Sequence, residues 1–185
     1  MKKTILSILV IVIGGLTINA QDARYGVRLG ANLSSISSDV IVDDLDKGRI
    51  GVVVGFFAEY ALTSKLSIQP EIQYSGQGNK DKDLRINYIQ IPVMLKYSIT
   101  DLINIQLGPK AGIKIWEWED NQSNITDFST FDFAVAAGIG VNITDNFFVD
   151  VNYALGLSNV FDKDGSPVGI DGTSRNIQLS VGYRL

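Results

Sequence analysis

The chain has 185 residues, a length that suits one domain, and it contains neither cysteine nor histidine. Without these residues it has no disulfide, no thiolate site, no imidazole general base and no imidazole metal ligand, which excludes most hydrolase and metalloenzyme chemistry. The formal net charge of −4 gives nucleic acid no electrostatic attraction, so no nucleic-acid partner is expected.

The first twenty residues have the layout of an export signal. Lys2 and Lys3 precede an almost unbroken apolar run over residues 5–18, and Ile18-Asn19-Ala20 comes before the polar Gln21. An N-terminal membrane anchor is the alternative, but this run is shorter than the roughly 20 residues that a spanning helix needs. We therefore predict a signal peptide over 1–20, cleaved after Ala20, and one mature domain over 21–185.

From Arg24 onward, apolar and polar residues alternate with a period of 2, as in a strand whose two faces meet different surroundings. The pattern predicts eight strands of roughly 10 to 15 residues, long enough to cross a bilayer when tilted. The predicted strands cover residues 24–33, 50–62, 66–75, 84–99, 103–115, 129–143, 147–157 and 176–185.

Short and long connections alternate strictly between these strands. The segments 63–65, 100–101 and 144–146 are tight, whereas 34–49, 76–83, 117–128 and 158–173 are long and polar. An up-and-down barrel of the outer membrane has this alternation, because turns form one rim and loops form the other. The fold prediction is therefore all-β, an antiparallel up-and-down transmembrane β-barrel of about eight strands in the outer membrane.

The period of 2 leaves open whether the apolar face meets lipid or the core of a soluble ligand-binding barrel. Small residues dominate the polar face, which suits the cramped interior of a narrow barrel. These residues are Gly26, Gly30, Gly51, Gly55, Gly108, Gly112, Ala134, Ala136, Gly138, Gly140, Ala154 and Gly156.

Aromatic residues of the apolar face gather near the ends of the predicted strands, as membrane-interface girdles do. Near the tight turns lie Tyr25, Tyr60, Tyr97, Phe147 and Tyr183, and near the long loops lie Tyr74, Trp118 and Phe131.

Three prolines, Pro70, Pro92 and Pro109, fall inside predicted strands, although a closed barrel has no edge strand to hold them. We predict a β-bulge at each. The alternation also slips at Tyr88-Ile89, which predicts a bulge in the fourth strand.

Charged residues of both signs lie on the predicted lumen face. A gate, a proton relay or a binding site is one interpretation. We favour a structural plug of ion pairs and hydrogen bonds, because charges buried in a narrow lumen must find partners whatever the function. The set contains Arg24, Arg28, Lys96, Lys110, Lys114 and Arg184, with Glu59, Glu71, Asp132 and Asp150.

Two polar loop segments have two interpretations, a cation-binding site or a solvent-exposed loop that binds no ion. The acidic loop 117–128 lacks the spacing of an oxygen-ligand site, and in Asp162-Lys163-Asp164-Gly165 the glycine comes two positions too early for a calcium loop. No catalytic motif is present, and we expect no cofactor or metal.

The segment Tyr88-Ile89-Gln90-Ile91-Pro92-Val93-Met94-Leu95-Lys96-Tyr97, followed by residues 104–112, resembles the outer-membrane β-barrel proteins of the PorT-like family. The general layout agrees from the signal peptide to the final Tyr-Arg-Leu. The resemblance implies an outer-membrane barrel, and most proteins of that family lack an assigned biochemical activity.

We expect a non-enzymatic barrel that serves envelope structure, adhesion or a partner complex. A transporter or a lipid-modifying barrel is the alternative. The expected partners are outer-membrane lipid, the barrel-assembly machinery during biogenesis, and an envelope protein bound through the outer loops.

Overall fold

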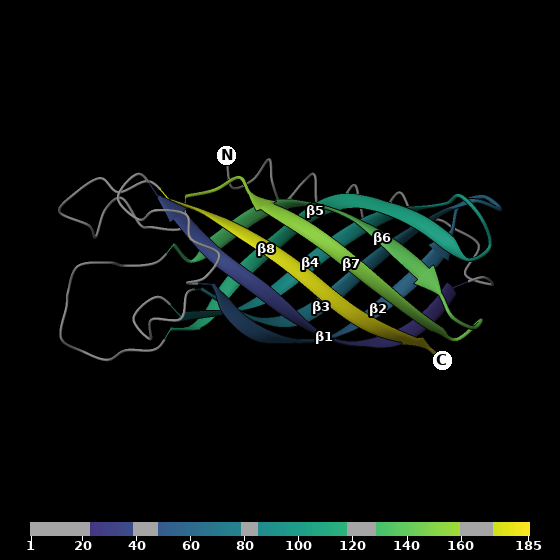
Figure 1. The fold of residues 1–185 in the computed structure, drawn as a ribbon, viewed down its shortest axis with the longest axis horizontal. Coiled ribbons are helices and arrows are strands. Elements are labelled where there is room, and N and C mark those ends of the chain that lie inside the picture. Colours follow the sequence, from purple (N-terminus) through teal and green to yellow (C-terminus); the bar gives the residue numbers. More distant parts are fainter. Residues whose placement is uncertain (1–22, 39–47, 79–84, 118–128, 160–171) are drawn as a thin grey trace, which may run out of the picture.

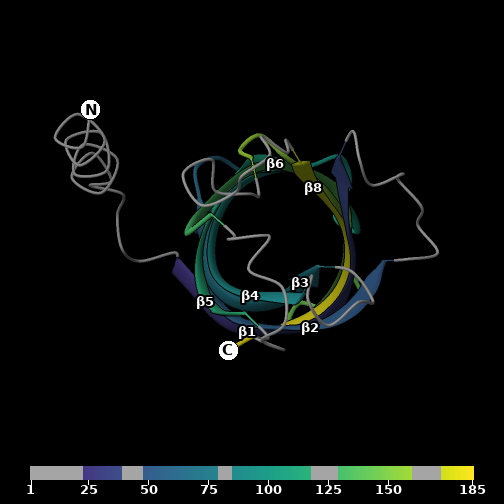
Figure 2. The same ribbon diagram turned by 90° about the vertical axis from the view of Figure 1, so that its left-hand side faces the viewer.

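The computed structural model describes residues 23–38, 48–78, 85–117, 129–159 and 172–185. They form eight strands: β1 (Ala23–Ser38), β2 (Arg49–Ala61), β3 (Leu66–Gly78), β4 (Arg85–Ser98), β5 (Ile103–Glu117), β6 (Phe131–Asn142), β7 (Phe147–Gly156) and β8 (Gly172–Arg184). Each strand pairs antiparallel with its neighbours in sequence, and β1 pairs with β8 to close the ring (Figures 1 and 2). The predicted eight-stranded up-and-down barrel is confirmed.

Strands β1 and β8 extend further at the long-loop end than the sequence pattern predicts. Residues 34–38 and 172–173 fall in predicted loops and 174–175 in no predicted strand, yet Ser34 to Ser38 pair with Asn176 to Gly172 across the β1–β8 seam. The alternation of apolar and polar residues is weak in both segments. Their pairing therefore depends on closure of the barrel, and the local sequence pattern does not predict it.

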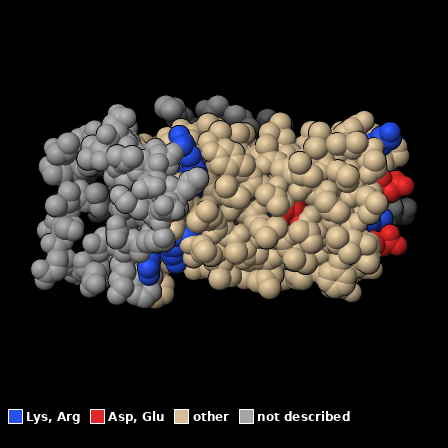
Figure 3. All heavy atoms as spheres, viewed as in Figure 1, with Lys and Arg blue, Asp and Glu red and all other residues tan. Residues whose placement is uncertain are grey.

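The outer surface is apolar over its middle. Outward side chains such as Leu29, Phe56 and Leu107 are 62%, 64% and 58% exposed. On the face shown in Figure 3, charged atoms gather at the two ends and almost none lie between them. Such a continuous apolar surface is what a lipid bilayer covers in a transmembrane barrel. No helix among the described residues is long and apolar enough to span a membrane.

Both aromatic girdles are present where the structure describes them. Tyr25, Tyr97, Phe147 and Tyr183 are exposed near the tight turns, and the rings of Phe147 and Tyr183 lie 4.7 Å apart. Tyr74 and Phe131 are exposed toward the opposite end of their strands, and Trp118 lies outside the described residues.

The three prolines do not produce bulges, so that prediction is wrong. The register of β2 and β3 is the same before and after Pro70, as Phe57 pairs with Glu71 and Tyr60 with Ile68. Two residue pairs of the β2–β3 ladder are missing at Pro70. The β3–β4 ladder lacks two pairs beside Pro92, and the β4–β5 ladder lacks two pairs beside Pro109.

Each proline stays paired with its following strand, which is why the register holds. Pro70 pairs with Val93, Pro92 with Lys110 and Pro109 with Val135. A missing N–H removes a hydrogen bond to one neighbouring strand only. The one register shift in these ladders lies between Asn87 and Tyr88 of β4, close to the predicted slip. The extra residue is Ile115, so the bulge lies in β5 and not in the fourth strand as predicted.

The three tight turns share one hydrogen-bonding pattern. Each has an apolar residue followed by threonine, and the N–H groups of Leu62, Ile99 and Ile143 donate across the turn to Leu66, Ile103 and Phe147. The hydroxyls of Thr63, Thr100 and Thr144 accept from backbone N–H groups two or three residues later. These side chains therefore replace backbone acceptors that the turn does not supply.

Replacing Thr144 by valine should lower the free energy of unfolding by about 1 kcal/mol, because two backbone donors lose their acceptor while the shape is kept. Thr144→Ser keeps the hydroxyl and should stay close to the parent. Reversible urea unfolding in lipid or detergent measures both variants, and equal losses would show that the hydroxyl does not stabilise the turn.

Candidate functional site

The interior of the barrel is the candidate site, and glycines make room for its large side chains. Gly26 lies opposite Phe57, and Gly182 lies opposite Phe148. A Cβ atom on either glycine would collide with the facing ring. The two rings meet edge to face, with centroids 5.5 Å apart and an interplanar angle of 68°. Glycines on the lumen face therefore serve as sockets for aromatic side chains from neighbouring strands.

Arg28 is the centre of a buried ion network. Its guanidinium lies 3.0 Å from Glu71 Oε1 and 2.9 Å from Asp150 Oδ1, and all three side chains are almost completely buried. Asn152 also donates to Asp150 Oδ1 at 2.9 Å. One cation of β1 thus joins carboxylates from β3 and β7, which lie on different sides of the lumen.

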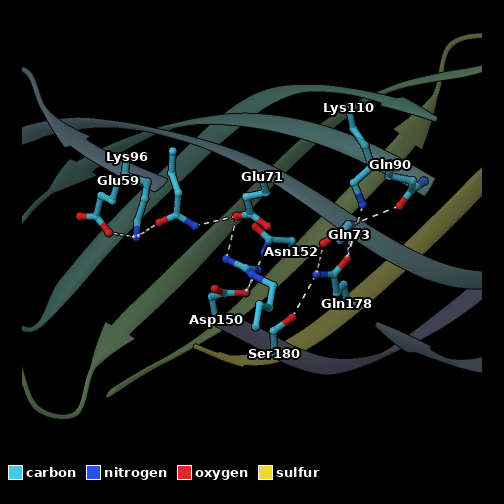
Figure 4. A network of polar contacts seen from close by, with 12 residues as sticks. Glu59, Glu71, Gln73, Gln90, Lys96, Lys110, Asp150, Asn152, Gln178 and Ser180 are labelled. Atoms are coloured by element: carbon cyan, nitrogen blue, oxygen red, sulfur yellow. Dashed lines mark hydrogen bonds and ion pairs between the residues drawn. The ribbon is translucent and has the colours of Figure 1, made fainter. Parts of the chain in front are cut away.

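Gln69 connects this cluster to a second group of charges, in which Figure 4 shows Lys96 beside Glu59. Its amide nitrogen donates to Glu71 Oε1 at 2.6 Å, and its oxygen accepts from Lys96 Nζ at 2.8 Å. Lys96 Nζ lies 3.2 Å from Glu59 Oε2, which is also 3.3 Å from Arg184 Nε. The network therefore runs along the lumen from Asp150 to Arg184.

The ring of Phe148 lies among three of these cations. The charged groups of Arg28, Lys96 and Arg184 are 5.7, 4.7 and 4.6 Å from its centroid. The face of an aromatic ring attracts cations, and the attraction is strongest where water is excluded. Phe148 is 1% exposed, so it supplies part of the electrostatic compensation that the carboxylates leave incomplete.

Glutamines form a second group of lumen contacts. Lys110 Nζ lies 3.5 Å from Gln178 Oε1, and Gln178 and Gln73 exchange contacts of 3.4 and 3.5 Å. Gln73 also donates to Gln90 at 3.2 Å. The carboxylates that face Lys110 are those of Glu71, Asp132 and Asp150, at longer range.

The structure brings most of the predicted lumen residues together. Six of them belong to the connected network: Arg28, Glu59, Glu71, Lys96, Asp150 and Arg184. Lys110 and Asp132 are buried nearby, and Asp132 accepts a hydrogen bond from Ser158. Arg24 and Lys114 differ: Arg24 is exposed at the tight-turn end, and Lys114 is half-exposed beside the bulge.

Sequence reasoning missed the aromatic and amide members of the interior. Phe148 has the phase of Asp150 and directly follows the outward Phe147, so one of two adjacent aromatic residues had to face the lumen. Gln69 and Gln73 share the phase of Glu71 in the same way. A neutral residue that lies an even number of positions from a buried charge on the same strand can therefore be predicted to face the lumen.

The middle of the lumen is nearly full. The cavity between Arg28, Glu71, Lys110 and Gln178 measures about 10 Å³, room for about one water molecule. The buried charges balance, with Arg28, Lys96, Lys110 and Arg184 against Glu59, Glu71, Asp132 and Asp150. Among the described residues, no three acidic side chains are grouped as a metal site would require.

Comparisons with known proteins identify the same architecture. The family model of the outer membrane protein β-barrel domain matches residues 8–184. Neisserial surface protein A has a similar structure, with a TM-score of 0.60 and 14% identity over 89% of this chain and 100% of that chain. Ail, the attachment invasion locus protein of Yersinia pestis, has a TM-score of 0.53 and 15% identity over the same shares.

Ail in complex with the heparin analogue sucrose octasulfate gives a TM-score of 0.55 and 18% identity, again over 89% of this chain and 100% of that chain. At these identities the likeness establishes the fold alone. No curated protein matches the chain in sequence.

Replacing Arg28 by methionine should lower the free energy of unfolding by about 3 to 5 kcal/mol, because it leaves two buried carboxylates without their shared cation. The double variant Arg28→Met/Glu71→Gln restores the balance of lumen charges and should lose less than the single variant. Reversible unfolding in lipid measures both. A single variant as stable as the parent would mean that water screens these charges.

Proposed function

The chain belongs to the family of outer membrane protein β-barrel domains, and we propose that it is a non-enzymatic barrel with a plugged lumen, serving envelope structure, adhesion or a partner complex through four outer loops. Residence in the outer membrane follows from the family. The proposal concerns what the barrel does there.

The nearly filled lumen is the observation that carries this proposal. Its charged side chains bind one another across the barrel, and the space left between them holds about one water molecule. A transporter needs a path for its solute through or along the lumen. A permanently filled interior instead favours a barrel that works as a rigid support for its ends.

The four long connections are the segments that we propose to contact a partner. Residues 39–47, 79–84, 118–128 and 160–171 contain twelve Asp or Glu against four Lys. Long loops of outer-membrane barrels face the cell exterior and short turns face the periplasm. A partner bound through these loops should therefore present basic side chains, because opposite charges favour association.

Three finer points belong to the same proposal. We propose that residues 1–20 are a cleaved signal peptide, that the barrel-assembly machinery inserts the mature chain, and that the chain belongs to the PorT-like branch. Support comes from the tripartite N-terminus and from the Tyr88–Tyr97 motif.

Purified barrel in a planar bilayer should show no stable large conductance, because eight strands enclose an interior that side chains fill. Removing both lumen rings in Phe57→Ser/Phe148→Ser should increase leakage, and this variant shows that the assay detects an opened lumen. Stable, ion-selective conductance in the parent protein would contradict the plug and favour a transporter.

Neutralising the loop 118–128 in the variant Glu119→Gln/Asp120→Asn/Asp127→Asn should reduce crosslinking of the barrel to its envelope partners in intact cells. The matched control is Asp101→Asn/Asp145→Asn, which neutralises exposed acids of the tight turns. Gel mobility before and after heating confirms folding of each variant. Crosslinks that survive the loop change and disappear in the control would place the partner at the other end.

A further inference from the structure

The tight-turn end of the barrel contains a hollow that the proposed function does not use. Two adjoining cavities of about 350 and 480 Å³ share Arg24, Glu59, Ser64 and Ser98 and open between the three turns. We call this space the turn-end vestibule. Its volume is in the range of small-molecule binding sites, unlike the nearly filled middle of the lumen.

The floor of the vestibule carries charges of both signs. Its carboxylate is that of Glu59, which lies 3.2 Å from Lys96 Nζ and 3.3 Å from Arg184 Nε. Arg184 also donates to the backbone oxygen of Asp145 at 3.2 Å and to Asn142 Oδ1 at 3.0 Å. Arg184 lines the larger cavity, whereas Lys96 is buried and lines neither cavity.

Arg24 is a further cation at the vestibule, and among the described residues its guanidinium has no side-chain hydrogen-bond acceptor of its own. It pairs in register with Glu59 across β1 and β2, yet the Glu59 carboxylate turns toward Lys96 and Arg184. Within the described part of the chain, no side chain accepts a hydrogen bond from the exposed Arg24 guanidinium, which lines both cavities. A planar guanidinium in this situation is suited to bind a carboxylate through two parallel hydrogen bonds.

Acidic side chains lie at the outer edge of the same space. Asp101 and Asp145 are exposed on two different turns and line the larger cavity together with Arg24. Lys65 lines the smaller cavity from the third turn. The larger cavity is therefore lined by two cations, Arg24 and Arg184, and by three carboxylates, an arrangement that favours a ligand carrying both charges over a simple anion.

We propose that the turn-end vestibule binds a small zwitterion, an amino acid or short peptide. Its carboxylate binds Arg24 near Arg184, and its ammonium lies toward Asp101 and Asp145. Ser64 and Ser98 supply hydroxyls that both cavities share for the polar groups between. In the orientation proposed above, this ligand comes from the periplasm.

Calorimetric titration of the full barrel in nanodiscs with alanyl-alanine tests the proposal. The dipeptide should bind saturably, and Arg24→Gln should weaken it about tenfold or more, because a charge-assisted hydrogen bond is lost. Arg24 is exposed, so the variant should fold, and heat-dependent gel mobility checks this. Arg175→Gln is the matched control, since it removes the same charge from β8 near the long-loop end and should bind like the parent.

Modified ligands test the contributions of the carboxylate and of the ammonium one at a time. Alanyl-alanine amide lacks the carboxylate and should lose most of the affinity, whereas the N-acetylated dipeptide lacks the ammonium and should lose less. In the variant Asp101→Asn/Asp145→Asn, the dipeptide and its acetylated form should bind alike. No saturable binding, unchanged binding to Arg24→Gln, or equally tight binding of acetate or inorganic phosphate would overturn the proposal.

Discussion

The narrow bore of an eight-stranded cylinder is the constraint on which the rest of this structure depends. Because β1 pairs with β8, every second residue of each strand must fit into one shared interior. Glycine opposite a large ring, in the pairs Gly26–Phe57 and Gly182–Phe148, satisfies that constraint locally. The same constraint brings polar side chains of different strands within contact distance across the lumen.

Electrostatic balance follows from this crowding. Burying a charge in a low-dielectric interior is costly unless a partner of opposite sign is close, and buried pairs contribute little net stability even when their geometry is good. The main effect of Arg28 between Glu71 and Asp150 is therefore on the specificity of lumen packing, because it favours the arrangement that keeps these charges together. Any other packing of the lumen would separate these charges. The Phe148 ring supports the arrangement by accepting three cations on one side chain.

The two ends of the barrel differ in construction. At one end, three short turns surround the charged vestibule, and in each turn a threonine hydroxyl accepts a hydrogen bond from the backbone. At the other end, the four long connections together contain twelve Asp or Glu against four Lys, and β1 and β8 continue several residues beyond the alternating pattern. The nearly filled middle of the lumen lies between the two ends.

The sequence by itself determined the number of strands, their two faces, the alternation of turns and loops, and a set of ten charged residues on the lumen face, of which the structure places all but Arg24 and Lys114 in the interior. All of these follow from period-2 patterning and turn residues, which are local properties. Only the tertiary structure decided that Arg28 meets both Glu71 and Asp150, that Lys110 contacts Gln178, and that three prolines leave the register unchanged. The physical reason is that contacts across the lumen depend on the stagger between strands, which ring closure sets. The distance between Arg28 and Asp150 along the chain, 122 residues, carries no information about that stagger.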